Sequence, residues 1–124
     1  MLIAAGVFAI LLGVIHSILG ELLIFKKLRH KTVVPTQGGS LLAARQLRIL
    51  WASWHLVTLF GWSLGAILWT IAFASSSHVD VIGMITYNIA AIMLCSALLV
   101  LFATKGKHPG WVVLTLISVL TLLS

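Results

Sequence analysis

Four apolar runs, separated by polar connections, dominate the pattern of this sequence. They cover about residues 2–25, 49–74, 81–103 and 110–124. Runs of about 20 apolar residues can cross a bilayer as helices, and the second helix is expected to start outside the membrane, from about residue 40, because no helix breaker follows Ser40. The pattern predicts a single domain, residues 1–124, that is an all-α membrane protein with four transmembrane helices in an antiparallel up-down bundle.

The last of these runs is short for a spanning helix. Residues 110–124 make about 22 Å of helix, whereas the hydrocarbon core of a bilayer is about 30 Å thick. We therefore expect the end of this run to lie near or within the far headgroup layer, with local thinning of the bilayer.

The composition agrees with a membrane protein and excludes a water-soluble domain. Hydrophobic residues make up 61% of the chain and charged residues 8%, which is too little charge to cover a soluble surface. The formal net charge of +6 does not indicate nucleic-acid binding, because the basic residues lie between or beside apolar runs. They indicate membrane orientation and contacts with the anionic headgroups of the lipid bilayer, and they are Lys26, Lys27, Arg29, Lys31, Arg45, Arg48, Lys105 and Lys107.

The distribution of these basic residues predicts the orientation of the chain. Six lie in or beside the first connection and two in the third, while the second connection carries Asp80 and no Lys or Arg. Under the positive-inside rule, the first and third connections are cytoplasmic and both termini lie on the extracytoplasmic side, as expected for a protein of a bacterial inner membrane.

Two features predict how the helices associate. Gly6, Gly13 and Gly20 are spaced by seven residues, which places them on one side of the first helix. Small side chains let a neighbouring helix approach closely, so this run is expected to be a packing helix. In the third run, Asn88 is expected to form a hydrogen bond to another helix.

The second run carries polar and aromatic side chains on one side. Residues that are three or four positions apart share a helix face. The residues of this run that follow such spacing are Arg48, Trp51, His55, Thr58, Trp62, Gly65 and Trp69. We expect this stripe to be the working face of the protein.

Four ionisable side chains are expected to meet in the cytoplasmic half of the membrane. His16, Glu21, Arg48 and His55 come from two consecutive helices and lie at similar predicted depths. A lone carboxylate in hydrocarbon is costly, so Glu21 is predicted to pair with Arg48 or with Arg45. Such a pair either joins the two helices or leaves Glu21 as a proton carrier or cation ligand.

The two histidines also allow a cofactor site. On facing helices, their imidazole nitrogens could coordinate a transition metal, or bind the iron of haem b from both sides with indole rings covering the macrocycle. The alternative is a neutral histidine that is hydrogen-bonded to Glu21, to Ser17 or to a backbone carbonyl group. The residues of the candidate cofactor site are His16, His55, Trp51 and Trp62.

The sequence contains no motif of a standard enzyme. It has no P-loop, no glycine-rich dinucleotide fingerprint and no HExxH motif, so catalysis is not expected. Because little of the chain lies outside the predicted spans, the leading hypothesis is an accessory or structural subunit that packs against other membrane subunits. One alternative is an electron-transfer protein with haem or a metal at His16 and His55. Another is a small dimeric proton-coupled transporter that uses Glu21.

In size and in number of predicted spans, the chain resembles the small multidrug resistance exporters, which also carry one glutamate in the first helix. The resemblance implies a transporter in which Glu21 is alternately protonated and occupied by a cation. Glu21 lies near the end of its run. The exporters carry their glutamate at mid-depth and differ in the residues beside it, so the resemblance covers these three features only.

Overall fold

The structure, a computed structural model, describes residues 1–74 and 80–123 of the chain. Over these residues the protein is helical, with α1 at Leu2–Leu23, the short 3₁₀ helix η1 at Phe25–Leu28, α2 at Ala44–Ala74, α3 at Val81–Thr104 and α4 at Gly110–Leu122. The helices α1, α2 and α3 are long and apolar enough to cross a membrane, whereas α4 is shorter. The prediction of an all-helical protein is confirmed over these residues, and its three long apolar helices are compatible with a membrane bundle.

The helix boundaries differ from the predicted ones at the first connection. α1 ends at Leu23 instead of about residue 25, and α2 begins at Ala44 instead of about residue 40. Before α2, Gly38 pairs with Leu42 across a turn in which Gly39 has a φ of +64°. Glycine adopts this left-handed conformation without steric cost, so the turn replaces the expected first helical turn. Residues 75–79 of the predicted second connection and residue 124 at the end of the last predicted run lie outside the described residues.

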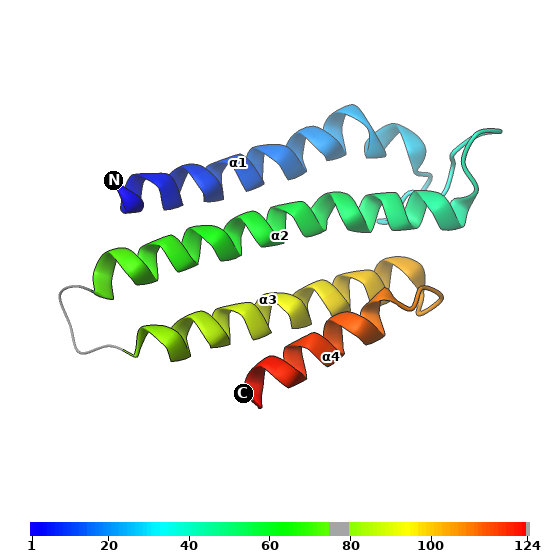
Figure 1. Ribbon diagram of the computed structural model, residues 1–124. Coiled ribbons are helices and arrows are strands. Elements are labelled where there is room, and N and C mark those ends of the chain that lie inside the picture. The colour runs from blue at the N-terminus through cyan, green and yellow to red at the C-terminus, as the bar shows by residue number, and fades with distance from the viewer. Residues whose placement is uncertain (75–79, 124) are drawn as a thin grey trace.

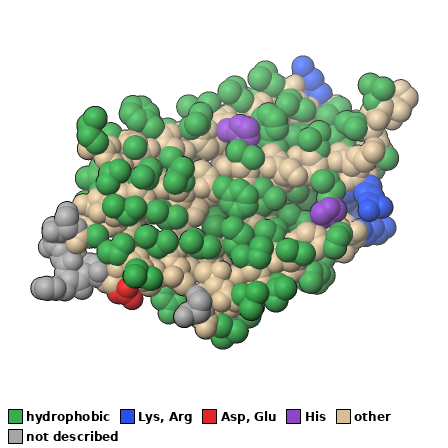
Figure 2. Space-filling view, viewed as in Figure 1, with side chains coloured by type: hydrophobic (Ala, Val, Ile, Leu, Met, Phe, Trp, Pro, Cys, Tyr) green, Lys and Arg blue, Asp and Glu red, His purple; other side chains and the backbone are tan. Residues whose placement is uncertain are grey.

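The helices follow one another in a row, as Figure 1 shows. α1 packs against α2, α2 against α3, and α3 against α4. The connection from α1 to α2 and the turn from α3 to α4 lie at the same end of the molecule. In Figure 2, Lys and Arg side chains gather at this end and an acidic side chain lies toward the other. We call the end that carries these two connections the basic end.

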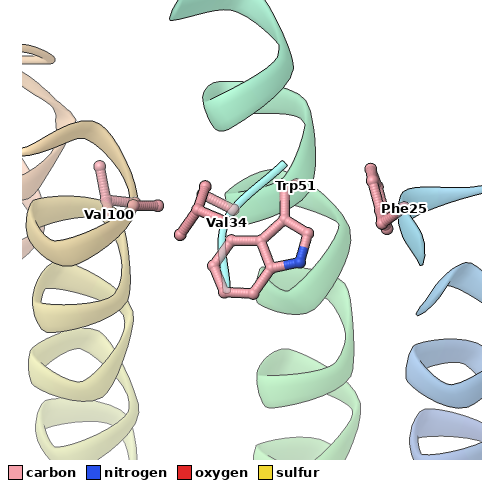
Figure 3. Close-up of a cluster of buried hydrophobic side chains, with 6 residues drawn as sticks. Phe25, Val34, Trp51 and Val100 are labelled. Atoms are coloured by element: carbon pink, nitrogen blue, oxygen red, sulfur yellow. The ribbon is translucent and has the colours of Figure 1, made fainter. Parts of the chain in front are cut away.

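The first connection folds against the helices. Phe25 and Pro35 are fully buried, and Val34 is 7% exposed. Phe25 and Val34 belong to a buried hydrophobic cluster with Trp51 of α2 and Val100 of α3 (Figure 3). The connection thereby covers the basic end of the α1–α2 pair, although its composition predicts only a polar segment.

Glycines of α1 and tryptophans of α2 form the interface between these helices. Each of three glycines accommodates one indole ring, in the pairs Gly6 with Trp69, Gly13 with Trp62, and Gly20 with Trp54. A Cβ atom at Gly13 would lie 2.8 Å from Trp62 Nε1, closer than a side chain tolerates. The three indole N–H groups donate hydrogen bonds to α1 carbonyl groups, at 3.1 Å to Ile3, 3.2 Å to Ile10 and 3.0 Å to His16. The expected close approach at the glycines is confirmed, and indole rings occupy the space that they leave.

Candidate functional site

Glu21 lies in a polar cluster between α1 and α2, which we define as Ser17, Glu21, Arg29, Trp51, His55 and Thr58. Glu21 Oε2 accepts a hydrogen bond from the Arg29 guanidinium, and Oε1 accepts one from Trp51 Nε1 at 2.6 Å. The Glu21 side chain is 30% exposed and that of Arg29 is 25% exposed. Donors face both carboxyl oxygens, an arrangement that suits an ionised carboxylate because this group only accepts hydrogen bonds.

His55 links this carboxylate to two hydroxyl groups. Its Nε2 atom lies 3.0 Å from Glu21 Oε1, and its Nδ1 atom lies 2.8 Å from Ser17 Oγ. Ser17 Oγ lies 2.8 Å from Thr58 Oγ1, and the Thr58 hydroxyl donates to the Gly13 carbonyl oxygen at 3.1 Å. A continuous chain of hydrogen bonds therefore runs from Glu21 to the backbone of α1.

Helix periodicity explains why these groups meet. Ser17 and Glu21 are four positions apart on α1, while Trp51, His55 and Thr58 follow steps of four and three on α2. One face of each helix thus supplies the cluster. The predicted stripe on α2 faces α1 from Trp51 onward, since its later members also contact α1.

Comparisons with protein families, curated proteins and solved structures give no match for this chain. The polar cluster is the part of the described chain where ionisable groups of different helices meet inside the candidate spans.

The ion pair of Glu21 differs from the predicted one. Glu21 pairs with Arg29, which follows η1 in the first connection, instead of with Arg48 or Arg45. The folded connection brings the Arg29 guanidinium back toward α1. Spacing along the sequence does not reveal this return, because it depends on the buried residues that hold the connection against the helices.

Arg48 lies apart from the polar cluster. It donates a hydrogen bond of 3.3 Å to the Ala103 carbonyl oxygen, near the C-terminal end of α3. Arg48 precedes His55 by seven residues, about 10 Å along the helix, so it lies closer to the basic end than Glu21 does. A cation is favoured at a helix C-terminus, where carbonyl groups lack helical partners.

The two histidines of the predicted haem or metal site make other contacts in the structure. Both ring nitrogens of His55 are engaged, with Glu21 and with Ser17. The His16 ring stacks on Trp54 with 4.3 Å between centroids, and its Nε2 atom is buried with no hydrogen-bond partner among the described residues. Within residues 1–74 and 80–123, no group of three or more His, Cys, Asp or Glu side chains is placed to hold a metal ion. His55 would have to leave the polar cluster to act as a ligand.

The indole rings that were predicted to cover a cofactor are engaged as well. Trp51 donates to Glu21, and Trp62 donates to the Ile10 carbonyl oxygen at 3.2 Å. The alternative interpretation, a histidine hydrogen-bonded to Glu21 and Ser17, describes His55. These contacts hold α1 and α2 together.

Sequence analysis missed two residues of this region. No pattern pointed to Arg29, which was one of several basic residues in a connection. Trp54 had a usable signal, because it precedes Trp62 by eight residues, close to the seven-residue spacing of the α1 glycines.

Polar contacts also join the other helices. Ser63 of α2 donates a hydrogen bond to Asn88 Oδ1 of α3, which confirms the bond predicted for Asn88. Ser118 of α4 donates to the Ala90 carbonyl oxygen of α3 at 2.8 Å. Hydrogen bonds of this kind stabilise helix association in lipid.

Proposed function

We propose that this chain is a proton-coupled membrane transporter in which His55 binds the exchanged proton and Glu21 is its counter-ion. The observation that carries the proposal is the chain of contacts from Glu21 through His55, Ser17 and Thr58 to the Gly13 carbonyl oxygen, which can only accept a hydrogen bond. Ionisable residues within membrane spans are costly and commonly belong to ion or proton pathways.

The hydrogen-bond chain is complete only when His55 is protonated. A hydroxyl group has a single hydrogen and donates one bond. When Thr58 donates to the Gly13 carbonyl oxygen, it must accept from Ser17, and Ser17 must then accept from His55 Nδ1. His55 already needs a hydrogen on Nε2 to donate to the ionised Glu21. Hydrogens on both nitrogens make an imidazolium ion.

Loss of the His55 proton reverses the donor and acceptor roles in part of this hydrogen-bond chain. Neutral His55 keeps its hydrogen on Nε2 for Glu21 and accepts a hydrogen bond from Ser17 at Nδ1. Ser17 then accepts from Thr58, whose hydrogen is no longer available to the Gly13 carbonyl oxygen. One hydrogen bond between α1 and α2 is therefore lost, and two hydroxyl groups rotate. Proton binding is coupled to helix packing in this way.

The net charge of the polar cluster differs between the two states of His55. Arg29 and Glu21 neutralise each other, so protonated His55 adds a net positive charge to the polar cluster. The His55 side chain is only 17% exposed, and an added charge costs free energy where water is largely excluded. Proton binding at His55 therefore changes the net charge of the polar cluster as well as its hydrogen bonds.

The far end of the hydrogen-bond chain reaches a pocket. Gly13 and Thr58 line this pocket of about 260 Å³, together with His16 and several apolar side chains. An organic cation bound there would repel the proton on His55, because like charges interact strongly in a medium of low dielectric constant. Because the proton and the cation exclude each other, the protein would exchange a proton for a cation that has an apolar surface.

Reconstitution into liposomes tests this proposal. With a pH-sensitive dye inside and an inward gradient of tetraethylammonium, the wild-type protein is expected to move protons outward and raise the internal pH. His55→Asn is expected to abolish this signal. His30→Asn, which changes an exposed histidine of the first connection, is the matched control and should retain it. Failure of the wild-type protein to move protons, or equal movement in His55→Asn, would refute the proposal.

The membrane arrangement proposed with this function is the predicted one, with four antiparallel spans in a bacterial inner membrane and both termini outside. In its support, the glycine–tryptophan pairs run in opposite order along α1 and α2, and both basic connections lie at one end. α4 has 13 residues, about 20 Å of helix, so its end would stop within the far leaflet.

With Cys95 replaced by alanine, Lys31→Cys is expected to react with an impermeant maleimide only after the cells are permeabilised. Reaction in intact cells would reverse the orientation.

A second candidate function, an accessory or structural subunit, is favoured by the open face of α1. This helix packs mainly against α2, and apolar side chains on its other side, such as Phe8 and Leu12, are about 70% exposed. Lipid or a helix of another membrane subunit can cover such a face. This role predicts co-purification with a larger complex in mild detergent, and a solitary, fully active protein would contradict it.

A further inference from the structure

A basic pocket lies between the start of α2 and the turn from α3 to α4. It has a volume of about 280 Å³, and the charged or ionisable side chains that line it are Arg45, Arg48, Lys105, Lys107 and His108. Figure 2 shows a histidine beside Lys and Arg side chains at the basic end. The pocket therefore concentrates positive charge at the end where both basic connections meet.

These cations have no acidic partner within the part of the chain that the structure describes. The chain contains two acidic side chains, Glu21 and Asp80. Glu21 is engaged with Arg29 and His55 in the polar cluster. Asp80 accepts a hydrogen bond from the Gly83 N–H at the start of α3, away from the basic end. The positive charges of the basic pocket therefore repel one another, and a bound anion that is not part of the described chain would reduce this repulsion.

Two of the lining side chains are held in place by hydrogen bonds and have further N–H groups that can bind a ligand. His108 Nδ1 accepts a hydrogen bond from the Gly110 N–H at 3.1 Å, so the hydrogen of its neutral ring is on Nε2 and can be donated to a ligand. Arg48 uses one of its five N–H groups for the Ala103 carbonyl oxygen. Guanidinium groups bind phosphate oxygens through short, charge-assisted hydrogen bonds.

An apolar groove continues from the basic pocket. Ile49 and His108 line both the basic pocket and this groove, which has a volume of about 380 Å³. Apolar side chains of α2, α3 and α4 form its walls: Ala52, Leu56, Val100, Val113 and Leu114. From Ile49 to Leu56 the groove extends about 10 Å along α2, away from the basic end.

We propose that the basic pocket and the groove together bind one anionic phospholipid, with its phosphate in the pocket and an acyl chain in the groove. The cations select a net negative headgroup, because the ammonium group of a zwitterionic lipid would be repelled. The groove favours a lipid over a soluble phosphate, because an acyl chain can fill it and pack against its apolar walls. Basic pockets between transmembrane helices bind lipid headgroups in this manner.

Charge variants test the headgroup part of the site. Phosphatidylglycerol and phosphatidylcholine are titrated separately into the delipidated protein in detergent, and bound lipid is counted by native mass spectrometry. Wild type is expected to prefer phosphatidylglycerol. Arg45→Gln combined with Lys107→Gln should weaken its binding about 25-fold, about fivefold for each lost cation. Lys26→Gln combined with Lys31→Gln removes the same charge from exposed positions of the first connection and should change binding less than twofold. Equal weakening of phosphatidylglycerol binding in both double variants, or equal binding of the two lipids by the wild type, would overturn the proposal.

A groove variant distinguishes a lipid from a free phosphate. Ser53 is exposed and lines the groove, so Ser53→Phe fills it without a change of charge. This variant is expected to bind phosphatidylglycerol at least tenfold more weakly, whereas Val112→Phe, at an exposed position on α4, should not. Unchanged thermal unfolding without lipid checks that both variants fold. If inorganic phosphate displaces the lipid at equal concentration and Ser53→Phe has no effect, the occupant is a phosphate ion and the lipid proposal is wrong.

Discussion

Alanine at Gly20 is expected to disturb the α1–α2 interface, whereas alanine at Gly61 is not. A Cβ atom at position 20 would lie 2.6 Å from Trp54 Cε2 and 2.7 Å from Trp54 Cδ1, with Nε1 closer still. The Trp54 ring has little freedom to move, because its N–H donates to the His16 carbonyl oxygen and the ring stacks on the His16 imidazole. At Gly61, the nearest atom to an added Cβ is the Ala9 carbonyl oxygen, at an ordinary contact distance of 3.7 Å.

Opposing contributions set the size of the effect. Alanine is favoured over glycine within a helix by about 1 kcal/mol, and this gain applies at both positions. At Gly20, overpacking costs about 1–3 kcal/mol, and displacement of Trp54 loses a hydrogen bond and a ring contact of about 1 kcal/mol each. Gly20→Ala should therefore lower the free energy of unfolding by about 2–4 kcal/mol. Gly61→Ala should leave it unchanged or raise it by up to about 1 kcal/mol.

The two variants are compared by unfolding in mixed micelles, with helicity followed by circular dichroism as the denaturing detergent increases. A Trp54→Phe background provides the double-mutant cycle, because the smaller ring leaves room for a methyl group. In that background Gly20→Ala should cost at least about 1 kcal/mol less than in the wild type. Equal stability of Gly20→Ala and Gly61→Ala would refute the close packing of Trp54 against Gly20.

Three further outcomes are expected in the same unfolding assay. Arg29→Gln should lower the free energy of unfolding by about 1 kcal/mol, and Glu21→Gln added to it should cost little more, because the pair is already broken and the amide oxygen of glutamine can still accept from Trp51 and His55. Arg48→Gln should show no coupling to Glu21→Gln, since Arg48 bonds to α3. Ser63→Ala should cost about 0.6 kcal/mol, and Asn88→Ala should add little to it. Strict additivity in the first or third cycle would contradict the pairing, and coupling in the second would contradict the placement of Arg48.

Local periodicity in the sequence determined which residues lie on the same face of a helix. Hydrophobic runs predicted α1, α2 and α3, because in lipid the backbone N–H and C=O groups must be hydrogen-bonded within the segment, and a helix meets this requirement without other segments. The seven-residue spacing of Gly6, Gly13 and Gly20 marked the packing side of α1, and the stripe from Trp51 to Trp69 marked the side of α2 that meets it. These features depend on a fixed rotation per residue, so the sequence by itself determined them.

Tertiary structure alone decided which charges meet. The first connection is held by Phe25 and Pro35, buried against the helices, and this packing brings Arg29 to Glu21 while Arg48 turns to α3. Spacing along one helix places a residue on a face, but it does not determine where a connection returns or how two helices are registered. Both depend on packing between segments far apart in the sequence, which is why the prediction named Glu21 and His55 but not the Arg29 that pairs with Glu21.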